Sequence, residues 1–561
     1  MTGQHPDQDA GHTVTAEPAP KDSERAKSRR RRKEFLGTRH LVRLALRRDR
    51  IVMPIWVLVL GFIPAATVGA YDQLYPDAAG RASLGAGIAA NPTLRLLYGP
   101  PFDLSTAGGY TAWRFGAFAG LFVGLACIFT VTRHTRQEED TGRQELLSST
   151  VTGRRAPLAA ALLVAGAAAL ATGLITTVLL IAARLPAAGS IAFGLGIALT
   201  GWVYAGIAAI TAQIAEFSRT ANGIATAVLG TTFLLRAVGD SATDIGWLSW
   251  LSPIGCATRV QPFAGERWWV LALLAGAAVV LCGLAYWLLP RRDIGMGIVS
   301  SRPGPAAASW LSSPFALAWR LHRGMLTGWL AGFAVSGLLF GSMADGIGDL
   351  VGNSEQVRQT FERMGGASAM VDAFIAVMAN LFGMVAALYA VQATLRMRSE
   401  EVALRLEPVL ATRTRRLQWA AGHLVFSLVG SAVLLMVGGL GVGLVHGAKV
   451  HDIGGQIPAL LGASIAQLPA VWVVAGVAVI AFGFVPKYSA LGWSAASLAL
   501  VLALYGPLLR LPQAVVDVSP FTHVPRLPSA ELTLTPLLWL TGTAVVLITL
   551  GLAGFKRRDI G

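Results

Sequence analysis

The chain has 561 residues, 54% of them hydrophobic, with a mean hydropathy of +0.57 and a formal net charge of +15. A soluble domain is usually about 45–50% apolar, and here the excess lies in long uncharged runs such as residues 51–71 and 157–183, which excludes an ordinary globular protein. The positive charge lies in the N-terminal tail and in alternate loops rather than in a folded basic domain, so we expect no nucleic-acid partner.

Residues 1–33 are rich in Pro, Asp, Ser, Lys and Arg and predict a disordered, basic cytoplasmic tail, because such a segment cannot bury a core. Residues 34–50 predict an interfacial helix with arginines along one stripe and apolar residues opposite. The stripe consists of Arg39, Arg43, Arg47 and Arg50. The second half repeats this pattern, with Arg320, Arg323 and Trp329 in place of Arg47, Arg50 and Trp56.

Twelve apolar segments follow, each close to the roughly 20 helical residues that cross about 30 Å of hydrocarbon. The first half contains the segments 51–71, 111–132, 158–182, 191–215, 222–239 and 268–289. The second half contains the segments 324–344, 371–395, 419–445, 459–484, 488–508 and 535–555. The predicted fold is therefore an all-α polytopic membrane protein with two six-helix halves, residues 34–298 and 312–561, joined by a cytoplasmic linker at 299–311.

The charges of the loops predict the orientation of these spans. Arginines and lysines gather in alternate loops, whereas the segments after the third and ninth spans contain one each, Arg184 and Lys449. Positive loops mark the cytoplasmic side, so we expect a multi-pass cell-membrane protein with both termini in the cytoplasm. Because six is even, both halves enter the membrane in the same direction, and the predicted symmetry axis runs along the membrane normal.

Two sequence motifs occur once in each half. Residues 132–154 align without gaps with residues 394–416, so that Glu138-Glu139 recurs as Glu400-Glu401. The sequence Arg-Arg-Asp-Ile-Gly occurs at 291–295 and again at 557–561. Self-similarity in a fixed order indicates two copies of one structural unit. In a membrane protein such a duplication points to a transport pathway.

The loop that contains the first glutamate pair is the strongest candidate site. Glu138 and Glu145 are seven residues apart, which predicts that they share one face of a short helix, with Arg143 nearby. Such a helix, with Leu146 and Leu147 as apolar contacts, would fit a groove on a cytoplasmic partner. The alternative is a solvated loop whose arginines only set the topology. The recurrence of the loop in the second half favours docking.

The order of an interfacial helix, two spans, an EE-x-x-x-R-x-E loop and four further spans resembles a type-2 ABC exporter permease over residues 34–561. More narrowly, it resembles the actinobacterial permeases of polyketide or tetronasin-like antibiotic exporters, in which two six-span halves are fused. In that family the loop after the second span is the coupling helix that contacts the ATPase. The resemblance implies these coupling residues: Glu138, Glu139, Arg143, Glu145, Glu400, Glu401, Arg405 and Glu407.

The second loop departs from the first at Gly142, which becomes Leu404, and at Leu146, which becomes Pro408, and these changes predict unequal docking of the two loops. The chain has no glycine-rich phosphate loop, because none of its six lysines follows a glycine. ATP and Mg are therefore expected on a separate ATPase, and the resemblance implies two copies, one under each loop. We expect no cofactor, metal or catalytic residue in this chain, and no disulfide framework among its three cysteines.

Polar and aromatic residues within the spans are candidates for a substrate path. Amide side chains in a span face another helix or a cavity, and aromatic rings can line an apolar path. Hydrogen bonds between helices and contact with lipid are the alternatives for each one. The candidates are Trp113, Phe118, Phe122, Gln213, Phe374, Asn380 and Gln392, with Gln467 considered on the same grounds.

Two further residues receive structural predictions. A central arginine in a span costs at least ~2.5–3.5 kcal/mol, so we expect Arg236 to extend outward to the membrane interface. His423 is predicted to be structural.

The leading functional hypothesis is a permease that exports hydrophobic or amphipathic compounds, such as antibiotics and other drugs, powered by a separate ATPase. A proton-coupled transporter of the major facilitator type is the alternative, because it also has parallel six-span halves and Asp140-Thr-Gly-Arg143 faintly resembles its loop signature. The second half reads Val402-Ala-Leu-Arg405 instead, and no span holds a convincing acidic proton site. A membrane assembly factor without transport activity is the third hypothesis.

Overall fold

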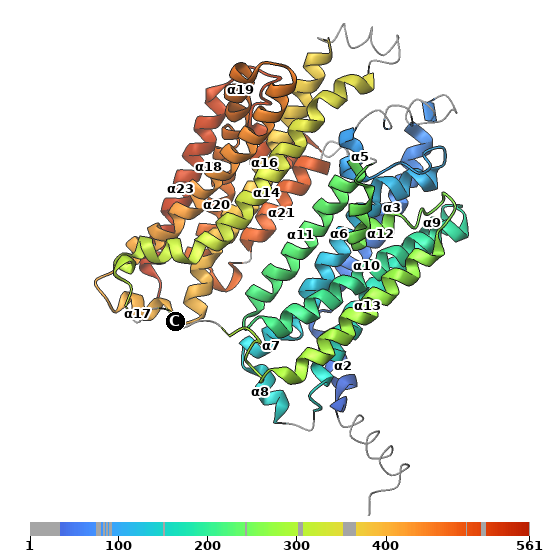
Figure 1. Ribbon diagram of the computed structural model, residues 1–561. Helices are drawn as coiled ribbons and strands as arrows, with labels where there is room; N and C mark the ends of the chain where they lie inside the picture. The colour runs from blue at the N-terminus through green and yellow to red at the C-terminus, as the bar shows by residue number, and fades with distance from the viewer. Residues whose placement is uncertain are drawn as a thin grey trace, which may run out of the picture. The chain divides into compact units, whose positions relative to one another are not determined.

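The computed structural model describes residues 34–559 apart from the gaps 75–79, 82–84, 86–87, 89–91, 150–151, 242–243, 301–303, 305–306, 352–365, 490 and 506–511. The predicted disordered tail lies outside the described residues. Within the described residues every regular element is a helix, which confirms the predicted all-α membrane class (Figure 1). The chain divides into two compact units, Met1–Pro303 and Gly304–Gly561. This division falls inside the predicted linker.

The first unit begins with the amphipathic helix α2 and the apolar helix α3, which meet at an angle of 75°. An amphipathic helix set across an apolar one is typical of a segment that lies in the membrane interface. The described helices of the unit are α2 (Thr38–Arg48), α3 (Val52–Leu74), α5 (Pro92–Tyr98), α6 (Ala107–Arg133), α7 (Arg136–Asp140), α8 (Arg143–Ser148), α9 (Ala156–Ala182), α10 (Ala187–Ile214), α11 (Ser218–Ser241), η1 (Gly246–Leu251), α12 (Pro253–Thr258), α13 (Trp268–Leu288) and η2 (Leu289–Arg291).

The second unit has the same order of long helices with different breaks. Its interfacial segment runs without interruption into the first span, as the single helix α14. The described helices are η3 (Ser309–Leu311), α14 (Pro314–Val351), α16 (Gly366–Val402), α17 (Leu406–Leu410), α18 (Arg416–Lys449), α19 (Ile453–Ile465), α20 (Leu468–Phe484), η4 (Pro486–Tyr488), α21 (Leu491–Tyr505), α22 (Gln513–Val516), η5 (Pro520–His523) and α23 (Leu534–Arg557).

Each of the twelve predicted spans overlaps a helix, but the described residues contain ten helices long and apolar enough to cross a membrane, or eleven if the bent pair α2–α3 counts as one span. The eleventh predicted span, at 488–508, corresponds to α21, whose described apolar part is shorter. The predicted span 459–484 is interrupted between α19 and α20 at Ala466 and Gln467. Pro469 follows directly and lacks the backbone N–H that a continuous helix would need.

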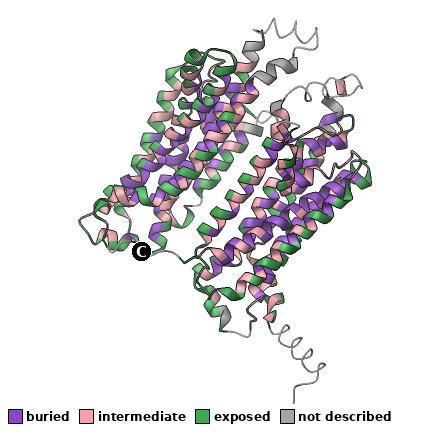
Figure 2. Ribbon diagram, viewed as in Figure 1, coloured by how far each residue is buried: buried purple, intermediate pink, exposed green. Residues whose placement is uncertain are grey.

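Small residues allow the central helices of each unit to approach closely. A Cβ atom added to Gly173 of α9 would lie 2.3 Å from the carbonyl oxygen of Gly194 in α10. In the second unit, a Cβ atom added to Gly483 of α20 would lie 2.1 Å from the carbonyl oxygen of Gly551 in α23. Backbone contact of this kind is a common way for helices to associate in a bilayer. The buried residues of each unit lie along these contacts (Figure 2).

Candidate functional site

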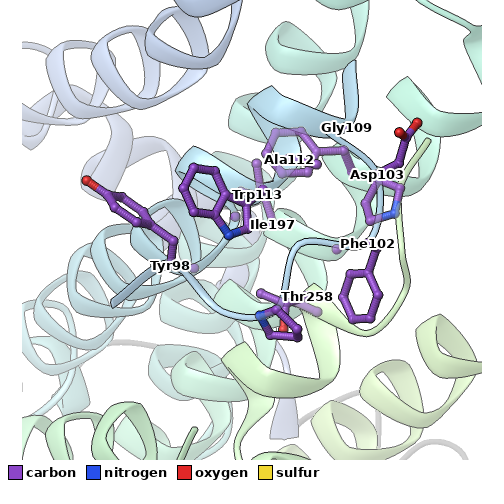
Figure 3. Close-up of a pocket in the computed structure, with 15 residues that line it drawn as sticks. Tyr98, Phe102, Asp103, Gly109, Ala112, Trp113, Ile197 and Thr258 are labelled. Carbon is purple, nitrogen blue, oxygen red and sulfur yellow. The ribbon is translucent and has the colours of Figure 1, made fainter. Parts of the chain in front are cut away.

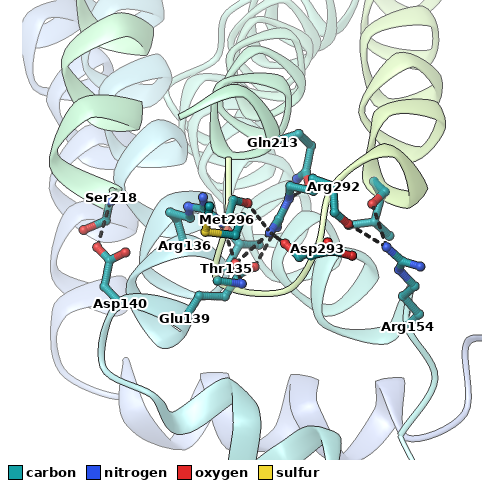
Figure 4. A network of polar contacts seen from close by, with 12 residues as sticks. Thr135, Arg136, Glu139, Asp140, Arg154, Gln213, Ser218, Arg292, Asp293 and Met296 are labelled. Carbon is teal, nitrogen blue, oxygen red and sulfur yellow. Dashed lines mark hydrogen bonds and ion pairs between the residues drawn. The ribbon is translucent and has the colours of Figure 1, made fainter. Parts of the chain in front are cut away.

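The duplicated loop of the first unit forms two short helices at the end of α6. Figure 4 shows the polar contacts around the first of them, α7. Glu139 of α7 accepts two hydrogen bonds from the guanidinium of Arg292, at 2.6 and 2.7 Å, in a side-by-side arrangement. Arg136 pairs with the same carboxylate, and the backbone N–H of Gly295 donates to it at 3.2 Å. The loop after the second predicted span is thereby joined to the segment that follows the last helix of the unit.

Arg154 and Gln213 complete this arrangement. We call it the first clasp, and its members are Arg136, Glu139, Arg154, Gln213 and Arg292. Arg154 donates to the backbone carbonyl of Arg292 at 2.7 Å. The Nε of Arg292 donates to Gln213 of α10 at 2.8 Å. Charge-assisted, paired hydrogen bonds to an arginine are among the strongest that side chains form. Both Glu139 and Arg292 are largely shielded from solvent, so water competes little for these bonds.

The second unit builds the same arrangement, the second clasp, from Arg398, Glu401, Arg416 and Arg558. Arg558 donates to both oxygens of Glu401, at 2.7 and 2.9 Å. Arg398 lies 3.0 Å from the same carboxylate. Arg416 donates to the backbone carbonyl of Arg558 at 2.9 Å. In place of a glutamine contact, the guanidinium of Arg558 lies over the rings of Phe482 and Phe555.

The two clasps explain why two distant motifs recur together in the sequence. In the alignment of the repeats, Arg136, Glu139, Arg154 and Arg292 correspond to Arg398, Glu401, Arg416 and Arg558. Each motif supplies one side of the contact in its own unit. The sequence interpretation treated the Arg-Arg-Asp-Ile-Gly motif only as a mark of duplication and missed its arginines as partners of the glutamates. The recurrence of both motifs was the available signal.

The other glutamate of each pair is also buried, in a different contact. Glu138 forms an ion pair with Arg48 of the interfacial helix α2 and lies 3.4 Å from Arg143. Glu400 lies 2.9 Å from Arg396 and 3.7 Å from Arg405. The first loop is therefore tied directly to its interfacial helix, and the ion pairs of Glu400 stay within its own helix and loop.

Four of the eight predicted coupling residues are exposed and lie beyond the clasps. They are Arg143 and Glu145 at the start of α8, and Arg405 and Glu407 at the start of α17. The prediction that Glu138 and Glu145 share one helical face is wrong, because the helix breaks between α7 and α8. Gly142 adopts a left-handed conformation there, with φ of +69°. The equivalent Leu404 keeps this conformation, with φ of +55°, although a side chain disfavours it.

The predicted substrate-path residues do not gather in one place. Gln213 belongs to the first clasp. Gln392 accepts a hydrogen bond from the indole of Trp329 at 2.9 Å, and Asn380 donates to the carbonyl of Phe521 at 3.2 Å. Phe374 packs against the core of the second unit, and Phe122 is exposed on the surface of α6. The remaining two, Trp113 and Phe118, both contact the ring of Tyr98.

Trp113 lines a small aromatic cleft at the opposite end of α6 from the clasp (Figure 3). Its indole donates to the carbonyl of Gly99 at 2.9 Å. The cleft has an open volume of about 30 Å³, far below the roughly 300–1,000 Å³ of a small-molecule site. In this conformation it does not admit a drug-sized compound.

Arg236 is fully buried inside the first unit and does not extend outward to the surface, so that prediction is wrong. Its guanidinium donates to the carbonyls of Leu96 and Leu97 at the end of α5, at 3.1 and 2.9 Å. Asp240, one turn along α11, lies 3.6 Å from it and also pairs with Arg259 at 3.0 Å. These carbonyls and the carboxylate compensate the buried charge. His423 is buried as well, 2.9 Å from His322, as expected of a structural residue.

Residues 311–556 match a protein family described as the C-terminal domain of the multidrug efflux system permease Rv1217c. The chain is also similar to the multidrug efflux system permease protein Rv1217c of Mycobacterium tuberculosis. The two are 45% identical over 529 residues, which cover 94% of this chain and 96% of the relative. This confirms the resemblance to exporter permeases that the repeated loops indicated. The chain belongs to the family of the multidrug efflux permease Rv1217c.

Proposed function

We propose that this chain is the permease subunit of an ATP-driven exporter that moves hydrophobic or amphipathic compounds out of the cytoplasm or its membrane leaflet. The similarity to a multidrug efflux permease over nearly the whole of both chains supports this function. The long apolar helices support a multi-pass membrane protein. The excess of positive charge in alternate loops favours a cell membrane location with both termini in the cytoplasm.

The observation that carries the proposal is that each clasp is followed by a short exposed helix, α8 or α17. The ATPase would contact these two helices, one copy at each, and would supply the ATP and Mg sites. The exposed Arg143 and Glu145, with Arg405 and Glu407, would form the polar contacts. Leu146 is 72% exposed and would provide an apolar contact at α8. The equivalent Pro408 cannot provide the same contact at α17, so the two dockings would differ.

In this proposal the clasps do not touch the ATPase. Glu139 and Glu401 hold each loop against the end of the last helix of its unit, so that a movement of the loop reaches that helix. Beside the first clasp lies an open cavity of about 460 Å³ lined by Glu139, Arg154 and Arg292. That the seven substrate-path residues line a path for the exported compound stays a prediction.

The experiment that tests the proposal is charge reversal on the two exposed helices. In the Glu145→Lys and Glu407→Lys double variant, we expect less ATPase to co-purify with the chain and drug efflux from cells to fall. The matched control is Glu531→Lys, an exposed glutamate between η5 and α23. It should leave both measurements unchanged. Equal ATPase recovery and efflux in the double variant and the wild type would refute docking at these helices.

A second measurement separates this function from proton-coupled transport. The purified chain is reconstituted in vesicles with and without the ATPase that co-purifies with it, and dye movement is followed. We expect transport only when the ATPase and ATP are present. Transport by the chain alone, in proportion to an imposed proton gradient, would refute the ATP-driven mechanism.

A further inference from the structure

An open groove runs along the surface of the first unit between α3 and α6. It has a volume of about 430 Å³, within the roughly 300–1,000 Å³ of typical ligand sites. Its walls are mainly apolar, with Trp56 and Val59 on α3 and Phe122 and Phe129 on α6. Both phenylalanines are close to half exposed. Apolar side chains in this position would face hydrocarbon in a membrane.

The groove has a polar end next to the interfacial helix. Arg133, at the end of α6, and Asp49, between α2 and α3, line it there, 3.0 Å apart. The neighbouring helix α2 adds a stripe of exposed arginines that form no ion pair within the described part of the chain. They are Arg39, Arg43 and Arg47, followed by Arg50. Arg133 and Asp49 balance each other in charge, and the exposed arginines of α2 and Arg50 add positive charge beside this end.

The length of the groove corresponds to one membrane leaflet. From Phe122 to Arg133 the helix rises by about 16 Å, at roughly 1.5 Å per residue. The hydrocarbon core of a bilayer is about 30 Å thick, so the apolar walls cover about half of it. An apolar groove one leaflet long with a cationic end matches a molecule with acyl chains and an anionic headgroup.

At the equivalent position of the second unit, two side chains join the first and second long helices. Trp329 corresponds to Trp56 in the repeat, and Gln392 corresponds to Thr130. The indole of Trp329 donates to Gln392 and packs beside Tyr389, with ring centres 6.1 Å apart. In the first unit, Thr130 instead bonds to the carbonyl of Ala126 in its own helix, 2.7 Å away. The shorter side chain leaves Trp56 and α6 on two sides of an open groove.

We propose that the groove between α3 and α6 binds one anionic phospholipid of the leaflet nearest α7, with its phosphate beside Arg133 and Arg50 and an acyl chain between Trp56 and Phe129. The inference does not depend on the proposed export function. It follows from the leaflet-length apolar walls, the basic end and the contrast with the second unit. Each arginine or lysine near the membrane surface raises the affinity of a basic segment for anionic lipid by about fivefold.

The test is native mass spectrometry of the full chain, after purification from nanodiscs with equal amounts of phosphatidylglycerol and phosphatidylcholine. We expect one retained phosphatidylglycerol on the wild type. Thr130→Gln should remove it, because the amide can bond to Trp56 as Gln392 bonds to Trp329. Thr130→Ser, which keeps the hydroxyl, should retain it. Arg133→Gln should keep a lipid but lower the preference for phosphatidylglycerol by about fivefold.

Retention of phosphatidylglycerol by Thr130→Gln at the wild-type level would overturn the proposal, as would a bound lipid without headgroup preference. A second measurement guards against misfolded variants. A photoreactive amino acid at Phe129 is activated in the native membrane, and the product is identified. A lipid adduct supports the proposal. A crosslink to a peptide from residues 304–561 would show that the protein itself covers the groove and would overturn it.

Discussion

The second clasp gives a quantitative prediction for Glu401→Gln. The carboxylate accepts two hydrogen bonds from Arg558 and pairs with Arg398, and its side chain is only 3% exposed. Removing one partner of a buried ion pair costs about 3–5 kcal/mol, because the other charge remains uncompensated. The new amide can still accept one hydrogen bond, and Arg398 is partly solvated, so we expect about 3 kcal/mol. For a unit of this size, each kcal/mol lowers the melting temperature by about 2–4 °C.

The expected result is a decrease in melting temperature of about 6–12 °C, measured from intrinsic tryptophan fluorescence of the purified chain in lipid nanodiscs. The matched control is Glu407→Gln, six residues further along the chain and exposed. A surface change of this kind alters stability by less than about 0.5 kcal/mol. The double variant with Arg558→Gln should lose less than the sum of the two single variants, because no unpaired charge remains.

The reasoning is refuted if Glu401→Gln melts within the error of Glu407→Gln. Strict additivity of the two clasp variants would also contradict it, because it would mean that Glu401 and Arg558 contribute independently. The same pair of measurements on Glu139 and Arg292 should give a similar coupling, since their distances are nearly the same.

Three other changes have expected outcomes. Leu404→Gly should stabilise the chain by up to about 1 kcal/mol and Gly142→Leu should destabilise it by about as much, because both positions are left-handed; equal melting temperatures would contradict this. Arg236→Met should remove two carbonyl contacts to α5 and increase hydrogen exchange at residues 92–98, at a cost of about 2–3 kcal/mol; unchanged exchange would show that Arg236 does not hold α5. Gly173→Ala should destabilise by about 1–3 kcal/mol through contact with Gly194, whereas Gly276→Ala, which meets nothing within 4 Å, should not.

The membrane spans could be predicted because each depends on local composition over about 20 residues. Every apolar segment found in this way overlaps a helix of the structure. The breaks were harder to predict. The interruption before α20 has a local signal in Pro469, but the long apolar run around it concealed the break.

The candidate site could be predicted only in part, because its contacts join residues far apart in the sequence. Glu139 and Arg292 are separated by 153 positions, and no local pattern pairs them. Only the recurrence of both motifs in the second half connects them. Arg236 shows the same limit, since the carbonyls that compensate its charge come from α5, about 140 positions earlier. The sequence of α11 alone predicts that Arg236 extends outward, whereas packing against α5 in the folded unit buries it.

The pairing of Glu139 with Arg292 also shortens the mechanical route through the first unit. Along the backbone, four long helices and the turns between them separate α7 from the end of α13. Each turn would absorb part of any displacement of α7. Across the guanidinium and carboxylate it passes in a single step of less than 3 Å. The loop at α7 and the segment after α13, 153 positions apart in the sequence, are therefore held directly against each other.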